Sequence, residues 1–222
     1  MDGRGAIRDQ AVEYPTRDGR PMGESDDHRK EMNDYAINVL KDCFRSDPMV
    51  YVSGNNFLYY TEGVPADCVS PDTYVVKGVS CVSRDIFKVW EEGGHVPCFV
   101  LEVTSKSTKL EDLGTKMARY RDDLGVPEYF LFDPRKDWVK GRLQGYRLDA
   151  GMYKLIEPGP SERLASRELG LELGVESSHV RFYLPGAVDP LPTFEERAYR
   201  AEEEARRLRE ELETLRQARP GT

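Results

Sequence analysis

A carboxylate inside an otherwise apolar segment is the feature that most constrains the fold of this chain. The segment Phe99-Val-Leu-Glu-Val103 is apolar at every position except Glu102. A continuous apolar run of this length is typical of a strand that is covered on both faces of a sheet. A buried carboxylate costs several kcal/mol unless it is paired or bound to a cation. The sequence therefore predicts a buried strand whose one polar side chain belongs to a site.

The residues that follow predict a helix and then a second strand. Thr108-Lys-Leu-Glu111 matches a capping box, so we expect a helix that begins there and ends at Gly125-Val-Pro127. Glu128–Phe132 is aromatic and apolar, which predicts a strand. Strand, helix and strand in this order form a right-handed crossover unit, so the two strands should be parallel.

The apolar face of this helix should pack on the sheet through Leu113, Met117 and Leu124. Lys116 borders that face on the side of Asp112 and Tyr120, where its amine can reach inward. The alternative is a surface lysine whose stem covers apolar residues while its amine stays in water.

The rest of the chain up to residue 192 predicts one further helix and several strands. From Asp26 to Phe44, apolar residues recur at three- and four-residue steps, which indicates an amphipathic helix with Ser25 or Asp26 as its N-cap. Short segments rich in Val, Tyr and Phe predict strands at residues 49–53, 56–60 and 73–76. Later strands are expected as an antiparallel extension of the sheet, at residues 144–148, 153–156 and 180–183.

The last part of the chain carries a heptad pattern. Apolar residues alternate steps of four and three between Glu and Arg, at Phe194, Ala198, Ala201, Ala205, Leu208, Leu212 and Leu215. This spacing predicts a long helix that pairs with a second chain as a coiled coil. The alternative is a single solvated helix that is stabilised by Glu and Arg at i,i+4 spacing.

Composition narrows the class of protein. Of the 222 residues, 39% are hydrophobic and 32% are charged, as in a globular domain. No apolar run approaches the roughly 20 residues that span a bilayer, and no signal peptide is evident, so we expect a cytoplasmic protein without a membrane partner.

The four cysteines and three histidines are dispersed, which argues against a zinc site. The net charge of −8 argues against a protein that coats nucleic acid, although an enzyme that cuts DNA needs only one basic groove.

Several motifs resemble one family of nucleases. Residues 99–134 contain Glu-Val-Thr-Ser-Lys-Ser-Thr, then Glu-Asp-Leu-x-x-Lys-x-x-x-Tyr, then Gly-Val-Pro-Glu-Tyr-Phe-Leu-Phe-Asp-Pro. This run resembles the Uma-type family of restriction endonucleases, in the PD-(D/E)XK nuclease superfamily. The charged tail is also similar to the family, as are four segments at residues 18–29, 50–54, 69–76 and 169–173.

The resemblance implies an α/β fold, with a restriction-endonuclease-like mixed sheet flanked by helices and a C-terminal coiled-coil helix. We expect an N-terminal arm at residues 1–23 and a nuclease-like domain at residues 24–192. The coiled-coil helix should occupy residues 193–217, and residues 218–222 should form a flexible end.

The resemblance also implies an active site. Asp72 matches the family's Pro-Asp aspartate, although a Pro-Asp dipeptide alone is typical of an ordinary turn. Glu102 matches the family's strand carboxylate, and the two should be neighbours on adjacent strands. The superfamily's usual lysine would stand at position 104, where this chain has Thr104. Lys116 on the following helix matches the family's lysine, and Lys106 is the alternative.

Three further residues are auxiliary candidates. Glu24 and His28 match a family motif at the first helix. The alternative explanation for Glu24 is that a carboxylate at a helix N-terminus is electrostatically favourable. Tyr120 closes the Lys-x-x-x-Tyr part of the helix motif.

Together these residues predict a metal-dependent endonuclease that hydrolyses DNA. Asp72 and Glu102 would hold Mg²⁺ or Mn²⁺, which prefer oxygen ligands, and Lys116 would assist the attacking water. A homodimer is expected through the coiled coil and the domain surface. The competing hypothesis is a non-cleaving nuclease-fold protein that acts as a scaffold through its coiled coil, and RNA is a less favoured substrate.

Overall fold

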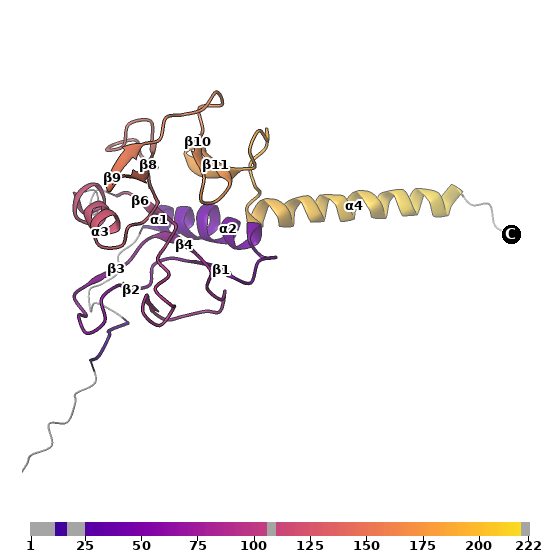
Figure 1. Ribbon diagram of the computed structural model, residues 1–222. Coiled ribbons are helices and arrows are strands. Elements are labelled where there is room, and N and C mark those ends of the chain that lie inside the picture. Colours follow the sequence, from indigo (N-terminus) through magenta and orange to yellow (C-terminus); the bar gives the residue numbers. More distant parts are fainter. Residues whose placement is uncertain (1–11, 17–24, 106–109, 219–222) are drawn as a thin grey trace, which may run out of the picture.

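The computed structural model describes residues 12–16, 25–105 and 110–218 (Figure 1). Its central sheet is mixed, with the strand order β1-β4-β6-β7-β8-β9. Strands β6 and β7 are parallel, and the other neighbouring strands are antiparallel. The six strands are β1 (Val50–Ser53), β4 (Thr73–Lys77), β6 (Phe99–Val103), β7 (Glu128–Phe132), β8 (Leu143–Asp149) and β9 (Met152–Leu155). The fold is therefore the predicted mixed sheet flanked by helices.

The predicted crossover unit is present between β6 and β7. Its helix consists of a π-helical stretch, η2 (Glu111–Lys116), that continues into α3 (Met117–Asp122). The predicted cap at Thr108 lies outside the described residues. Every residue of β6 and β7 is buried, as expected for strands covered on both faces.

The packing face of this helix differs from the prediction. Leu124 is buried and Met117 is partly buried, but Leu113 is 40% exposed. Asp112 and Tyr120 are the fully buried residues instead. A π-helix turns more slowly per residue than an α-helix, so positions four apart stay on one face and Leu113 rotates outward. The polar edge of the predicted face is therefore the face that meets the sheet.

The first predicted helix is continuous from α1 (Asp26–Lys30) through a π-helical stretch, η1 (Glu31–Ile37), to α2 (Asn38–Cys43). Ser25 is its N-cap, because its hydroxyl accepts a hydrogen bond of 3.2 Å from the backbone N–H of His28. The helix packs in a different core cluster from α3, on the opposite face of the sheet, so the sheet lies between two helical layers. Its buried apolar residues are Met32, Ala36, Ile37, Val39 and Leu40.

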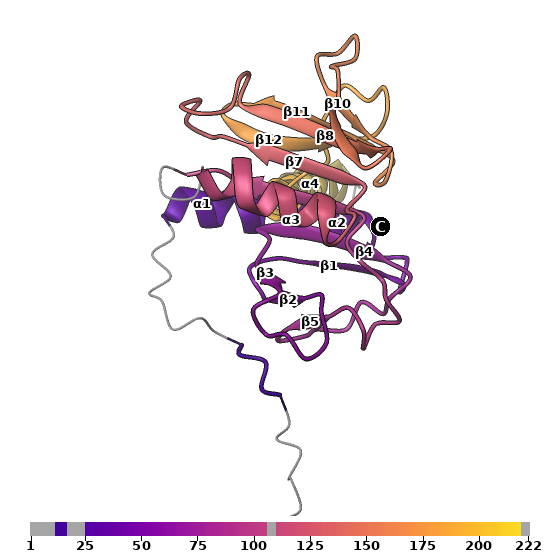
Figure 2. The same ribbon diagram turned by 60° about the vertical axis from the view of Figure 1, so that its left-hand side comes forward.

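Two small sheets lie at opposite ends of the molecule (Figure 2). One has the order β3-β2-β5, with β2 (Leu58–Tyr59), β3 (Cys68–Val69) and β5 (Phe87–Lys88). The other has the order β10-β11-β12, with β10 (Leu164–Ser166), β11 (Leu171–Glu176) and β12 (His179–Tyr183). The prediction that residues 180–183 extend the main sheet was therefore wrong. Val180 and Phe182 of β12 pack in the cluster beneath η1, and this long-range contact decides which sheet the strand joins.

The last helix, α4 (Phe194–Ala218), projects away from the rest of the molecule (Figure 1). The side-chain oxygen of Thr193 accepts a hydrogen bond of 3.2 Å from the backbone N–H of Glu196, as an N-cap does. None of the helices among the described residues is long and apolar enough to cross a membrane.

Gly54, just after β1, lies where the chain crosses close to Asp72. A Cβ at position 54 would lie 1.9 Å from the Asp72 carbonyl oxygen and 2.8 Å from Cδ1 of Ile37. We expect Gly54→Ala to lower the free energy of unfolding by at least about 2 kcal/mol, because backbone cannot yield as a flexible side chain does. Urea denaturation measures this.

The matched control is Gly159→Ala, where the nearest atom to a Cβ would be the Arg163 carbonyl oxygen at 3.7 Å. It should leave stability within about 1 kcal/mol of the wild type. Equal stability of the two variants would contradict the close approach at Gly54.

Candidate active site

Asp72 and Glu102 lie against each other at the junction of β4 and β6. Thr73 pairs with Leu101 in the antiparallel register, so Asp72 at the start of β4 stands opposite Glu102. The Asp72 backbone N–H donates to Glu102 Oε2 at 3.4 Å. The Asp72 carboxylate accepts a hydrogen bond of 2.7 Å from the Val103 backbone N–H. The structure thus brings together two carboxylates that are thirty residues apart, as the sequence predicts.

Glu102 is fully buried, and protein donors reach both of its carboxylate oxygens. The Tyr120 hydroxyl donates to Oε1 at 2.6 Å, and the Lys116 ammonium donates to Oε2 at 3.0 Å. Burial raises the pKa of Glu102 well above its ordinary value, and the positive charge of Lys116 acts in the opposite direction. Burial also raises the pKa of Tyr120 strongly, so this phenol remains a neutral donor.

Lys116 reaches the carboxylates from the π-helical stretch η2. Its ammonium lies 3.0 Å from Glu102 Oε2 and 3.1 Å from Asp112 Oδ1, and its side chain is 14% exposed. Burial lowers the pKa of Lys116, but the charges of Glu102, Asp72 and Asp112 outweigh burial and raise its pKa overall. The amine therefore stays protonated at neutral pH.

His28 contacts Asp72 from the first helix, α1. Its Nε2 lies 3.2 Å from Asp72 Oδ1. Burial raises the pKa of Asp72, but the hydrogen bond with His28 and the charge of Lys116 outweigh it and lower the pKa below its ordinary value. Of the two neighbouring carboxyls, Asp72 is therefore the one that ionises readily.

Asp112 is a site residue that sequence reasoning missed. It is fully buried and paired with Lys116 at i,i+4 spacing. Asp112, Lys116 and Tyr120 follow one another at four-residue intervals, and all three face the sheet. The signal was present in the Asp-x-x-x-Lys-x-x-x-Tyr pattern, but a charged residue on a helix is more often exposed than buried.

The other candidate positions divide into two groups. Glu24 and Lys106 lie outside the described residues. Thr104, where the superfamily's lysine would stand, is buried and continues the pairing of β6 with β7. Its backbone N–H donates to the Phe132 carbonyl oxygen at 2.7 Å, and its hydroxyl donates to the same oxygen at 3.3 Å.

The donor set suits a hard divalent cation. Lys116 contacts the buried carboxyl groups of Glu102 and Asp112, and the His28 imidazole contacts the buried carboxyl group of Asp72. Carboxylate oxygens are ligands that hard divalent cations prefer. Across residues 12–16, 25–105 and 110–218, no three side chains of His, Cys, Asp or Glu are arranged to hold a metal ion. A cation here would therefore use the Asp72 and Glu102 carboxylates, with backbone oxygens or water completing its shell.

Comparison with known proteins places these residues in context. Residues 6–181 match the family described as "Uma2: Putative restriction endonuclease". No curated protein matches the chain in sequence. Among solved structures, the chain is similar to one titled a putative nuclease belonging to DUF820 from Anabaena variabilis ATCC 29413. The two share 12% identity at a TM-score of 0.47, over 68% of this chain and 76% of that chain.

The raised pKa of Glu102 makes stability depend on pH in a definite direction. A group whose pKa is higher in the folded state stabilises the fold below its unfolded pKa, near 4.5, and this stabilisation is lost as pH rises towards the folded pKa. Glu102→Gln removes the ionisation and keeps the shape. In chelator, we expect the variant to gain stability over the wild type progressively from pH 4.5 to pH 8, measured by urea denaturation at each pH.

The control is Glu62→Gln, on an exposed turn, which should follow the wild type at every pH. A gap between Glu102→Gln and wild type that does not change with pH, or one that grows in favour of the wild type, would contradict the assignment of Glu102 as a strained buried acid.

Proposed function

The chain belongs to the Uma2 family, described as putative restriction endonucleases, and from this premise we propose that it is a metal-dependent endonuclease that hydrolyses DNA phosphodiester bonds. The observation that supports this most is the convergence of Asp72, Glu102 and Lys116 from two strands and a helix onto one point. A fold that needed only stability would be served as well by apolar residues of similar volume.

Each residue has a role in the proposed reaction. A divalent cation held by Asp72 and Glu102 would neutralise charge on the phosphate and acidify the attacking water. Lys116 would orient that water and stabilise the negative charge that develops on the phosphate oxygens. Tyr120 and Asp112 would act as positioning residues, because they fix the Glu102 carboxylate and the Lys116 ammonium by hydrogen bond and ion pair. His28 would hold the Asp72 carboxylate through its Nε2 atom.

The proposal extends to the metal and the assembly. Mg²⁺ or Mn²⁺ is the cation that the oxygen donors suit. The chain would act as a homodimer through α4 and the domain surface, because two linked sites can cut both strands of a duplex.

Removing one carboxylate charge should abolish cleavage without unfolding the protein. We expect Asp72→Asn and Glu102→Gln to stop nicking of supercoiled plasmid in Mg²⁺ or Mn²⁺, because each loses a ligand charge and keeps its shape. Agarose gels of nicked and linear product measure the rate. Asp123→Asn, an exposed substitution of the same kind, should cut like the wild type.

Wild-type protein that does not cut DNA in either metal would favour the scaffold hypothesis. Equal cleavage by the wild type and Glu102→Gln would instead show that the active site lies elsewhere in the protein. Cleavage of RNA but not DNA would change the substrate class and leave the residues in place.

The identity of the catalytic lysine is tested separately. We expect Lys116→Met to reduce the rate about 100-fold or more, because an ammonium 3.0 Å from Glu102 is lost, while Lys106→Ala and the exposed Lys140→Met cut normally. Thermal unfolding of each variant checks that it is folded. The reverse result, in which only Lys106→Ala is inactive, would transfer the role to Lys106.

A further inference from the structure

Helix α4 presents an apolar seam that nothing in the described part of the chain covers. Beyond its first turns the helix stands clear of the domain (Figure 1). Leu208, Leu212 and Leu215 are 53%, 49% and 60% exposed, and they occupy the seam positions of successive heptads. Three leucines exposed in one line indicate an interaction surface.

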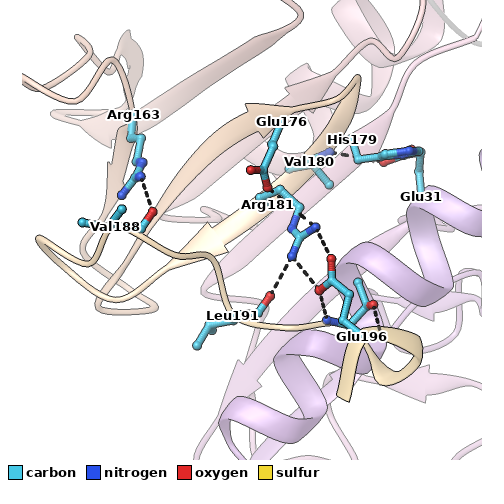
Figure 3. Close-up of polar contacts among 10 residues, drawn as sticks. Glu31, Arg163, Glu176, His179, Val180, Arg181, Val188, Leu191 and Glu196 are labelled. Atoms are coloured by element: carbon cyan, nitrogen blue, oxygen red, sulfur yellow. Dashed lines mark hydrogen bonds and ion pairs between the residues drawn. The ribbon is translucent and has the colours of Figure 1, made fainter. Parts of the chain in front are cut away.

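The base of the helix is fixed to the domain, so the direction of α4 is set by the fold. Arg181 of β12 forms two hydrogen bonds of 2.8 Å with the Glu196 carboxylate and donates to the Leu191 carbonyl oxygen (Figure 3). Arg197 pairs with Asp42 of α2. The first turn of α4 is therefore a stem, and the part available for pairing begins near Ala201.

Charges beside the seam distinguish the two possible orientations of a pair. In a parallel, in-register coiled coil, Glu204 faces Arg209 of the second copy, and Glu211 faces Arg216 of the second copy. From residue 201 to the end of the seam, each of these flanking contacts between the two copies joins a negative and a positive side chain. Within the described residues, these four side chains form no ion pair of their own chain, although Glu203 and Arg206 on the outer face do.

An antiparallel pair is less complementary. When Ala205 of one helix packs beside Leu208 of the other, Glu204 faces Glu211 of the second copy, and the twofold axis repeats this repulsion. In that arrangement Glu202 would lie opposite Arg209 of the second copy, which is an attractive contact. The antiparallel pair thus mixes attraction with repulsion, whereas the parallel pair has attraction alone.

The composition of α4 argues for a second copy over nucleic acid. The helix holds eight glutamates and six arginines, so it offers no basic stripe to a phosphate backbone. Its glutamates and arginines match each other when the same sequence lies alongside in the same direction.

We propose that residues 201–216 of α4 pair with the same residues of a second copy as a parallel, in-register, two-stranded coiled coil. The inference depends on the helix alone and stands whether or not the chain cuts DNA. About two heptads are short for an isolated coiled coil, so the dimer should dissociate measurably on dilution.

Glu204→Arg discriminates between the orientations in full-length protein. In the parallel dimer it places Arg against Arg209 twice, so we expect the dimer dissociation constant to rise on the order of tenfold. In the antiparallel dimer it would replace repulsion with attraction and tighten the dimer. Sedimentation equilibrium over a range of concentrations measures both.

Two further variants complete the experiment. Glu204→Arg/Arg209→Glu restores opposite charges in the parallel dimer and should return the dissociation constant towards the wild-type value. Glu210→Arg makes the same charge change on the outer face, where Arg206 and Arg207 lie four and three residues before it, and should have little effect. A wild type that is monomeric at every concentration, a trimeric mass, a tighter Glu204→Arg dimer or an unchanged one would each overturn the proposal.

Discussion

The hydrogen bond from the Lys116 ammonium to the Glu102 carboxyl group is the interaction on which the centre of this molecule depends. Strand β6 is buried on both faces, and a carboxylate in its middle would destabilise the sheet if it had no partner. Its partners come from the helix that follows in the chain: the Lys116 ammonium, fourteen residues later, and the Tyr120 hydroxyl. The crossover unit therefore satisfies the polar groups of the sheet as well as covering it, and its register on the sheet is fixed by polar contacts as much as by apolar packing.

Local patterns were sufficient to predict the central part of the fold. The apolar run around Glu102, the crossover helix and the strand Glu128–Phe132 all follow from periodicity and turn signals, and the parallel pairing of β6 with β7 follows from their order. Two outcomes did not follow, because tertiary contacts decide them. The π-helical stretch η2 turns Leu113 outward and Asp112 inward, and β12 joins a separate sheet beneath η1. The same holds for the candidate site. The family motifs in the sequence point to Asp72, Glu102 and Lys116, but only the packing shows that Asp112 is buried beside them.

The first helix connects the candidate site with the base of α4. His28 at its start contacts Asp72, and Glu31, one turn further, pairs with His179 of β12 and accepts a hydrogen bond of 3.3 Å from the Val180 backbone N–H (Figure 3). Tyr35 stacks on the His179 ring at 4.1 Å, and the Arg181 guanidinium lies 5.6 Å from the centre of the Tyr35 ring. Arg181 in turn holds Glu196 in the first turn of α4. The same helix thus positions an aspartate of the candidate site and the strand that anchors the projecting helix.

Lys116 lies on a helix, and Thr104 stands where the superfamily's usual lysine would follow β6. Completion of the candidate site therefore depends on how that helix packs on the sheet. A lysine on β6 would be in place as soon as the sheet formed. Here the carboxylates are assembled by strand pairing, whereas the ammonium is delivered only when η2 and α3 dock with Asp112 and Tyr120 inward. Any movement of η2 along the sheet would therefore displace the ammonium relative to both carboxyl groups.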